Sequence, residues 1–534
     1  MFSSDNMHCG SFQVHRRPRR TCGSQRSRLD RRGEGSRPHH LVDGLSLVVA
    51  AALVLFILKI RLSKKRLPLP PGPPADPLLG HLRLIPSSGQ DVFFHNLGKT
   101  YGDVVHLSIL GRSIVVLNSV HAAVELLDKR SANYSDRPKF PIYETMGLQD
   151  SLVFVPYGNN LRMYRKMLQQ YFSKENSKRH RPIQIREARL LADNILANPR
   201  RRGDLLIRFS TAVIVEIAYG HQIVSDDDPY VKIAEDVCEA TANSGPPGGT
   251  PVDIFPFLRH FPSWFPGAYY AGYARKTWHL VRKLYDFPTE CVTAEMARGE
   301  AKPSFLATHL EVLQRVIYIA GAETTSSTLA WFFLAMVLYP ECQTKAQEEI
   351  DAVVGRDRLP DFHDREHLPY VECLLQETLR WNQAAPSGIP HRSMEDDIYN
   401  GMFIPKGSFV IANTRGMTLD ENTYQNASEF EPTRYLRSPL GRGEPYPAGP
   451  FGFGRRACPG RHLANDSLWI AMATILSTVH ISREVAENGK EIIPDGTPVA
   501  EGITSHPPPF SCRLKPRSEM AQALLKQANS MERN

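Results

Sequence analysis

Cysteine is scarce in this sequence: there are eight in 534 residues, and no two of them form a Cys-x-x-Cys pair. This count and spacing argue against a disulfide framework and indicate reduced thiols facing the cytosol. Internal repeats are absent, and so are the glycine-rich fingerprints that bind flavin or nicotinamide nucleotides. With 42% apolar and 22% charged residues, the chain has the composition of an ordinary globular protein, in one large domain or several.

The main part of the chain also lacks an excess of basic residues, although the net charge of the whole chain is +8. Residues 1–40 carry nine arginines against three acidic residues, and the basic residues between 59 and 66 add most of the remaining surplus. Residues 67–534 are therefore close to neutral, with a net charge near −2. This distribution argues against a nucleic-acid-binding protein, whose basic residues would lie on the folded domain.

Long apolar runs are also rare. The clearest one separates the basic N-terminal residues from the rest of the chain. Gly44 to Leu58 is free of charge, and with the next two residues it reaches the length of a short transmembrane helix. A signal-peptide core and a buried helix remain alternatives. The predicted organisation is a disordered basic extension at 1–43, a membrane anchor at 44–60, a basic stop and Pro-rich hinge at 61–75, a catalytic domain at 76–518 and a polar tail at 519–534.

The stretch Phe451–Gly460 carries the strongest chemical signal, and it reads Phe-Gly-Phe-Gly-Arg-Arg-Ala-Cys-Pro-Gly. Cys458 stands just before a predicted helix, whose unpaired N–H groups and dipole favour a thiolate. A single thiolate of this kind suits the axial position of haem iron. The alternatives are a buried free cysteine in a turn and a phosphate loop, and the second fails because no Gly-Lys-Ser/Thr follows.

A second signal lies in the long Pro-free stretch between Pro303 and Pro340, which predicts a helix. Its centre, Ala320–Thr325, places an acid and two threonines inside an apolar run, where polar groups are costly unless paired. Gly321 weakens the helix, and a local break there would open room for O₂ and water. The alternative for Thr324 is a hydroxyl bonded to a carbonyl one turn earlier.

These two stretches together resemble the cytochrome P450 family, whose haem signature Phe-x-x-Gly-x-Arg-x-Cys-x-Gly is matched at every fixed position. The resemblance implies a mainly α fold with small β-sheets (α+β), in which haem b lies between a long central helix and the cysteine loop. It also implies a microsomal fungal type with a single N-terminal membrane helix. The residues matched to the signature are Phe451, Gly454, Arg456, Cys458 and Gly460.

The resemblance assigns roles to further residues. Cys458 would be the iron ligand, and Arg456, Arg165 and His391 would contact the haem propionates. Leu161 stands where relatives usually have a tryptophan donor, and a solvated helix charge remains the alternative for Arg165. Thr324 and Glu323 would relay protons to iron-bound oxygen. The Glu-x-x-Arg pair and the later arginine would hold the fold around haem, and they are Glu377, Arg380 and Arg434.

Substrate contacts, by the same resemblance, would come from the loops 140–154, 384–389 and 499–503, whose apolar character favours a lipophilic secondary metabolite or xenobiotic. Pro262, Trp264, Phe265 and Pro266 predict an apolar edge that dips into a bilayer. Electrons would come from NADPH-cytochrome P450 reductase, with cytochrome b5 as an additional donor. The expected location is the endoplasmic reticulum membrane with a cytosolic catalytic domain. A mitochondrial location is the alternative, because the Arg-rich extension also resembles a transit peptide.

Two other functions compete with this hypothesis. His363, Glu366 and His367 spell an inverted zinc-protease motif, which predicts a membrane-anchored zinc hydrolase, although no third ligand follows from the sequence. A non-catalytic haem-binding protein is the other alternative, and the Glu323-Thr324 pair argues against it. At the level of local structure, the alternation from 104 to 117 around Gly111-Arg112 predicts a β-hairpin, and 120–130, 161–173 and most of 180–300 predict helices.

Overall fold

The computed structural model describes residues 51–52, 54, 67–309, 318–499 and 502–531. The chain divides into a unit Met1–Arg66 and a unit Leu67–Asn534. The predicted anchor at 44–60 lies outside the described residues except for Ala51, Ala52 and Val54, and the extension at 1–43 lies wholly outside them. Within the described ranges, no helix has both the length and the apolar content needed to cross a bilayer.

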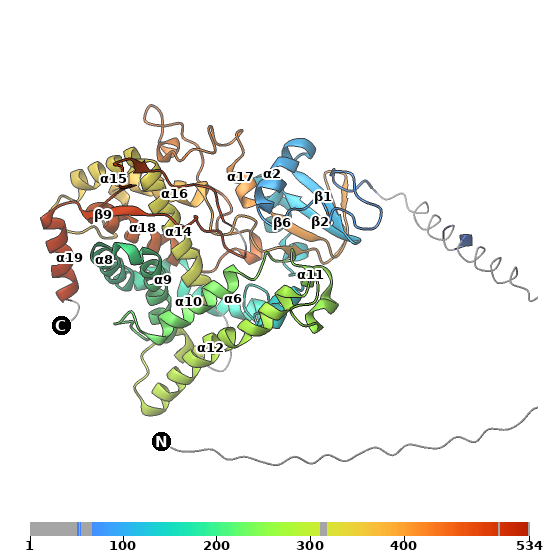
Figure 1. Ribbon diagram of the computed structural model, residues 1–534, viewed down its shortest axis with the longest axis horizontal. Coiled ribbons are helices and arrows are strands. Elements are labelled where there is room, and N and C mark those ends of the chain that lie inside the picture. Colours follow the sequence, from blue (N-terminus) through green and yellow to red (C-terminus); the bar gives the residue numbers. More distant parts are fainter. Residues whose placement is uncertain (1–50, 53, 55–66, 310–317, 500–501, 532–534) are drawn as a thin grey trace, which may run out of the picture. The chain divides into compact units, whose positions relative to one another are not determined.

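The larger unit is mainly helical, with three small sheets, as the sequence predicts (Figure 1). The longer helices are α2 (Gln90–Tyr101), α6 (Asn159–Phe172), α8 (Arg181–Ala197), α9 (Arg202–Tyr219), α10 (Pro229–Ala242), α12 (Tyr269–Arg298), α14 (Tyr318–Leu338), α15 (Pro340–Val353), α16 (Pro369–Trp381), α18 (Arg461–Thr478) and α19 (Glu519–Met531). Short helices and turns are α3 (Val120–Ala123), η1 (Val124–Lys129), α4 (Ser131–Tyr134), α5 (Pro141–Met146), α7 (Lys174–Ser177), η2 (Lys178–His180), η3 (Pro199–Arg201), α11 (Pro251–Ile254), η4 (Pro256–His260), α13 (Phe305–His309), η5 (Arg365–His367), α17 (Thr414–Thr418), η6 (Pro432–Tyr435) and η7 (Gly454–Arg456).

The largest sheet has the order β1-β2-β6-β3, formed by Val104–Ile109, Arg112–Leu117, Phe409–Ala412 and His391–Arg392. The predicted hairpin is confirmed, since β1 and β2 pair antiparallel with Ile109 opposite Arg112. Strand β6 joins β2 in parallel, which brings segments from the two halves of the sequence together. The smaller sheets are β4-β5 (Asp397–Tyr399, Met402–Ile404) and β8-β7-β9 (Glu491–Ile492, Val479–Val485, Cys512–Pro516).

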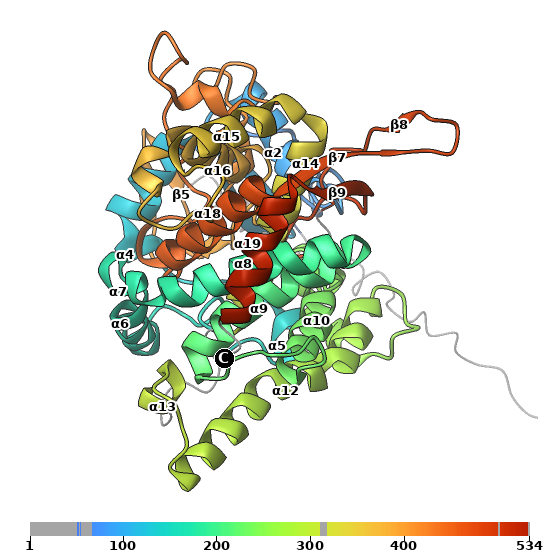
Figure 2. The same cartoon turned by 90° about the vertical axis from the view of Figure 1, so that its left-hand side faces the viewer.

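The main core lies where α8, α9, α14 and α18 pack side by side (Figures 1 and 2). Helix α14 is apolar around most of its circumference, as expected of a helix buried on several sides. Its Trp331, Phe332 and Phe333 are fully buried, and so is Trp469 of α18. This packing fixes α14 against α18, the helix that follows the Cys458 loop.

Two details differ from the sequence-based expectations. The Pro-rich segment predicted as a hinge is docked on the larger unit, because the carbonyls of Pro68 and Pro71 accept hydrogen bonds from the Phe403 and His106 amides. The predicted polar tail forms α19, whose Ala521, Leu525 and Asn529 are buried. Its apolar residues recur at helical spacing, and Figure 2 shows the helix lying along α8.

Candidate active site

The Cys458 loop has a backbone that glycine makes possible. Gly454 has φ of +57°, and a Cβ there would lie 2.0 Å from the Leu127 carbonyl oxygen, so only glycine fits. The Cys458 amide donates to the Phe451 carbonyl over 2.7 Å, which closes the loop and directs the chain into α18. Phe451, Cys458 and Gly460 all line one large cavity.

The pKa of the Cys458 thiol depends on the surroundings of the side chain in the folded protein. Burial raises its pKa, while the Gly460 amide, Arg165 and Arg461 act in the opposite direction. Burial thus opposes the thiolate form, which the helix N-terminus and the two arginines favour. A metal ion that replaces the proton would supply the missing stabilisation.

The cavity has a volume of about 310 Å³ and extends from the Cys458 loop to α14. The described residues that line the cavity include arginines and a histidine but no aspartate or glutamate. The basic groups are Arg137, Arg165, His391 and Arg456. The structure thus brings together the three predicted propionate contacts and adds Arg137, which sequence reasoning missed.

The positive charges of these basic groups repel one another. Burial lowers the pKa of Arg137 well below its usual value, and the neighbouring Arg456 lowers it further. Burial also lowers the pKa of Arg456, to about 10. The pKa of His391 falls for the same reason, with Arg137 as the second cause. Buried cations that repel one another require an anion, and the two carboxylates of a haem group would supply the matching charge.

The protein holds each of these cations in position through backbone carbonyls. Arg456 donates to the carbonyls of Ser135, Leu152 and Val155, and Arg137 to those of Val153, Ile389 and Pro390. The Nδ1–H of His391 donates to the Tyr134 carbonyl over 2.6 Å. The Arg165 guanidinium makes no hydrogen bond to the described residues, so it is free to bind a ligand oxygen.

The opposite wall comes from α14, through Ala320, Gly321, Thr324, Thr325 and Thr328. The expected break at Gly321 is not present, because the described helix runs without interruption from Tyr318 to Leu338. A Cβ at Gly321 would lie 3.1 Å from the Ile214 side chain of α9, so the glycine serves close helix packing instead. The helix start remains outside the description, since 310–317 are not described.

The two predicted relay residues occupy different sides of α14. Thr324 lines the cavity, and its hydroxyl donates to the Ala320 carbonyl over 2.8 Å, the local bond that was the alternative reading. Glu323 does not line the cavity. Its carboxylate is buried against Thr241 of α10 and against Thr504 and His506 of the C-terminal loop. One residue along a helix turns the side chain by roughly 100°, which explains the separation.

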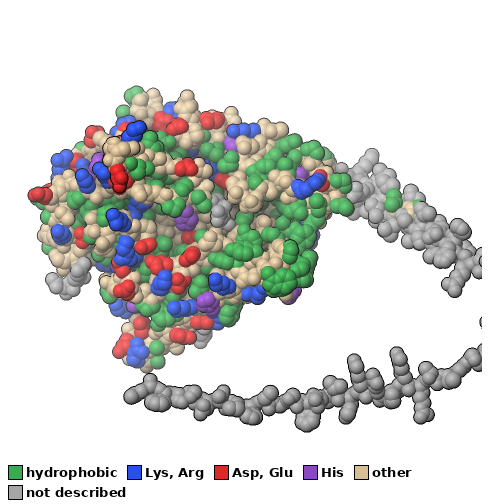
Figure 3. Space-filling view, in the orientation of Figure 1, with side chains coloured by type: hydrophobic (Ala, Val, Ile, Leu, Met, Phe, Trp, Pro, Cys, Tyr) green, Lys and Arg blue, Asp and Glu red, His purple; other side chains and the backbone are tan. Residues whose placement is uncertain are grey.

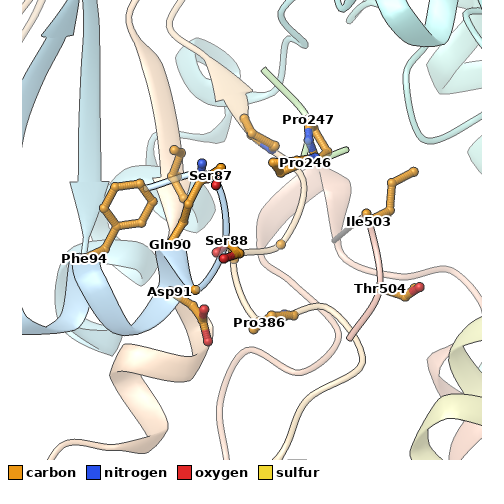
Figure 4. A pocket seen from close by; sticks show the side chains of 16 residues that line it. Ser87, Ser88, Gln90, Asp91, Phe94, Pro246, Pro247, Pro386, Ile503 and Thr504 are labelled. Carbon is orange, nitrogen blue, oxygen red and sulfur yellow. The ribbon is translucent and has the colours of Figure 1, made fainter. Parts of the chain in front are cut away.

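The ion-pair residues form a buried network beside the site. Glu377 binds both Arg380 and Arg434, and all three side chains are fully buried. Of the expected substrate loops, residues 152–153 and 384–389 contribute to the cavity, as do Phe209, Val213 and Ile214 of α9. Gly502 and Ile503 instead line a separate, smaller hollow, shown in Figure 4.

The zinc-hydrolase hypothesis finds no support in the geometry. In the part of the chain that the structure describes, no three His, Cys, Asp or Glu side chains are arranged to hold a metal ion. His363, Glu366 and His367 lie at the turn η5, where the His363 amide is bonded to Asp361.

A loop cysteine facing a threonine-lined helix, with basic groups spaced around the cavity between them, defines a haem-thiolate site. Comparison with known proteins agrees. The family model described as Cytochrome P450 matches residues 70–513, so this chain belongs to the cytochrome P450 family.

The alignments with curated relatives cover most of this chain and most of each relative. Cytochrome P450 monooxygenase 136 of Postia placenta is 38% identical over 87% of this chain and 92% of its own. A cytochrome P450 monooxygenase of Armillaria gallica is 36% identical over 91% and 100%, and monooxygenase claR of Ampulloclitocybe clavipes is 37% identical over 86% and 89%. The chain is therefore a monooxygenase that binds haem b through a cysteine thiolate and takes electrons from a redox partner.

Proposed function

We propose that this protein inserts one oxygen atom from O₂ into a neutral, lipophilic small molecule, a secondary metabolite or a xenobiotic. The observation that carries the proposal is the lining of the cavity. Apart from the basic groups around the haem site, it consists of apolar side chains, glycines and hydroxyls, including Val153, Phe209, Val213, Ile214 and Ile389. No described lining residue is a carboxylate, so a cationic substrate would lack a counter-charge.

Screening in cells that also contain a reductase tests this proposal. We expect neutral apolar compounds to be hydroxylated and to displace solvent from the cavity, with the associated change in the haem spectrum. Amines protonated at neutral pH are expected to be poor substrates because of the basic lining. Preferential oxidation of such amines would contradict the proposed substrate class.

The roles of the residues follow from their positions. Cys458 would hold the haem iron, and Arg137, Arg165, His391 and Arg456 would hold its propionates. Bound haem b supplies the iron that binds and activates O₂. Thr324 would position water and transfer protons at the cavity wall, because its hydroxyl can accept a hydrogen bond while donating to Ala320. Glu323 would supply those protons from the other side of α14.

Replacement of Thr324 by alanine tests this role. Without the hydroxyl, protons arrive in the wrong position, and we expect most NADPH electrons to appear as hydrogen peroxide instead of product. The share lost to peroxide should rise several-fold, as is typical when one acid–base group is removed. Peroxide and product are measured per NADPH consumed. Thr324→Ser should restore coupling, and unchanged coupling in Thr324→Ala would rule out the role.

Electrons would come from a membrane-bound NADPH-cytochrome P450 reductase, with cytochrome b5 as an additional donor. Support comes from a group of exposed basic residues near the Cys458 loop, here called the basic face: Arg162, Lys166, Lys174, Arg455 and Arg461. Arg461 acts electrostatically on Cys458, and Arg162 and Arg455 both stack on Tyr157. These basic residues outnumber the exposed acids beside them, Asp128 and Glu175, and such an excess favours an acidic protein partner.

Charge reversal at two of these positions should weaken electron delivery. We expect the double variant Lys166→Glu/Lys174→Glu to raise the KM for reductase about tenfold at low ionic strength, with a smaller effect as salt is added. Steady-state turnover at varied reductase concentration measures this. Lys276→Glu on α12 is the control and should leave the KM unchanged. A salt-independent effect, or an equal effect of the control, would argue against the basic face.

A membrane surface would complete this arrangement, with the apolar stretch 44–60 as anchor. Figure 3 shows apolar side chains gathered on the face that carries β1, β2 and α11. Exposed apolar residues from these neighbouring segments are Leu78, Leu84, Phe257, Trp264 and Tyr269. A patch of this kind fits a bilayer. The proposed location is the endoplasmic reticulum, and cell fractionation distinguishes it from the mitochondrial alternative.

A further inference from the structure

Glu323 is an acid without a lysine or arginine partner among the described residues. Only 3% of its surface is exposed, yet its ion-pair partner among the described residues is the imidazole of His506, 3.8 Å away. A buried carboxylate is normally matched by a fixed cation. Here the matching group is a histidine, whose ring nitrogens can donate or accept a proton.

A hydroxyl connects the two groups. Thr504 Oγ1 donates to Glu323 Oε1, and it lies 3.3 Å from His506 Nε2. Thr504 is itself buried, whereas the side chain of His506 is 37% exposed. His506, Thr504 and Glu323 thus form a continuous line from solvent to the residue that precedes Thr324.

The segment that carries this line is firmly held. The Ser505 carbonyl accepts hydrogen bonds from Ser327 and Trp331 of α14, and the Ser505 amide donates to the Ala384 carbonyl. His506 pairs with Val499 through two backbone bonds. On the other side, a Cβ at Gly502 would lie 2.5 Å from the carbonyl oxygens of Thr241 and Ala242. The geometry of Thr504 and His506 against Glu323 is therefore built into the fold.

A small polar hollow lies beside the same threonine. Thr504 lines a hollow of about 50 Å³ together with Ser87, Ser88, Gln90 and Asp91 (Figure 4). A polar hollow of this size holds ordered water, since one molecule needs only about 15 Å³ of such space. Protons lost by His506 can be replaced from bulk solvent, because its side chain is 37% exposed.

The surroundings of Glu323 accommodate both of its protonation states. When ionised, the carboxylate accepts from Thr504 and from Thr241, whose Oγ1 lies 3.1 Å from Oε2. When protonated on Oε1, it can donate to the Thr504 hydroxyl, which can in turn donate to the Nε2 of neutral His506 at 3.3 Å. A hydroxyl is both donor and acceptor, so neither state leaves a buried polar atom unpaired.

We propose that Thr504 and His506 form the proton entry from solvent to Glu323. The imidazolium of His506 gives its Nε2 proton to Thr504 Oγ1, the Thr504 hydroxyl proton passes to Glu323 Oε1, and water reprotonates His506. Glu323 then delivers the proton across α14 to the side of Thr324. The two entry residues act through Glu323 and are positioning residues, and the inference rests on the proposed relay role of the Glu323-Thr324 pair.

Infrared difference spectroscopy tests the entry directly in the full-length, haem-loaded ferric protein without substrate. The carboxyl band of Glu323 is identified as the band missing from Glu323→Gln. After a rapid pH jump, we expect this band to respond about tenfold or more slowly in Thr504→Val, because the relaying hydroxyl is gone. Thr504→Ser should restore the rate, and Ser505→Ala, a neighbouring buried hydroxyl, should leave it unchanged.

His506→Gln provides a second variant should Thr504→Val fold poorly, and it should also slow the response. A wild-type rate in Thr504→Val or His506→Gln overturns the proposal, and so does a Glu323 band that never changes with pH. Peroxide leakage in Thr324→Ala is measured in parallel. Leakage there with a wild-type infrared rate in Thr504→Val would refute the entry alone, whereas absence of leakage would refute the relay role of Thr324.

Discussion

The Cys458→Ala variant is expected to lose both the thiolate-type haem spectrum and monooxygenase activity. The reduced wild-type protein treated with CO should show the red-shifted Soret band of thiolate ligation, because Cys458 is the only cysteine that lines the described cavity. Without its sulfur, the loop retains its shape but offers iron no anionic ligand. Haem held without this thiolate would lack the electron donation that favours O–O cleavage.

Comparison with a second cysteine shows whether the effect is specific. Cys291 lies on α12, away from the cavity lining, so Cys291→Ala should keep the spectrum and the activity. Pyridine haemochrome measurement gives the haem content of each variant, which separates loss of haem from loss of the ligand. A thiolate-type spectrum with full turnover in Cys458→Ala would refute the assignment of the iron ligand.

The Glu377→Ala variant is expected to be the most destabilised of the single substitutions considered. Glu377 accepts hydrogen bonds from Arg380, Arg434, Tyr435 and the Glu431 amide, at 2.8–3.0 Å. Burial raises the pKa of Tyr435, and the Glu377 carboxylate raises it further, so the phenol remains a donor. Removing the carboxylate leaves two fully buried guanidinium groups without their shared anion.

Breaking a buried ion pair by removing one partner typically costs about 3–5 kcal/mol, which is a large part of a domain's total stability. We therefore expect little folded, haem-loaded protein from Glu377→Ala at 37 °C. Denaturant unfolding of the haem-loaded protein measures the loss. Glu300→Ala removes the partner of Arg298 in an exposed pair and serves as the control, with no measurable change expected. Equal stability of the two variants would show that the network is not structural.

Local chemistry explains why much of the site could be predicted. The residues from Phe451 to Gly460 belong to one loop. The position of the cysteine between glycines that permit tight turns is therefore visible in the sequence. The β1-β2 hairpin was predictable for the same reason, since a period of two and a central Gly-Arg pair define it. Helix α19 showed helical periodicity too, but its polar composition hid the buried face.

Other parts of the site depend on contacts between distant segments. Arg137 lies in an irregular stretch with no periodicity or motif, and only the approach of residues 389–391 and 456 makes it part of the cationic cluster. The Glu323 side chain likewise points away from the cavity because of the way α14 is rotated against α10 and the C-terminal loop. No spacing rule within one segment predicts such a rotation.

By itself, the sequence determined the family, the cysteine proposed as the ligand of haem iron and the helix that faces it, because each requirement is met by neighbouring residues. Only the tertiary structure decided the charge of the cavity, the partial burial of Cys458 and the link from Glu323 to His506. These properties arise where segments separated by more than a hundred residues meet. Burial and electrostatic interaction depend on distance in space, and the order of residues along the chain does not contain that distance.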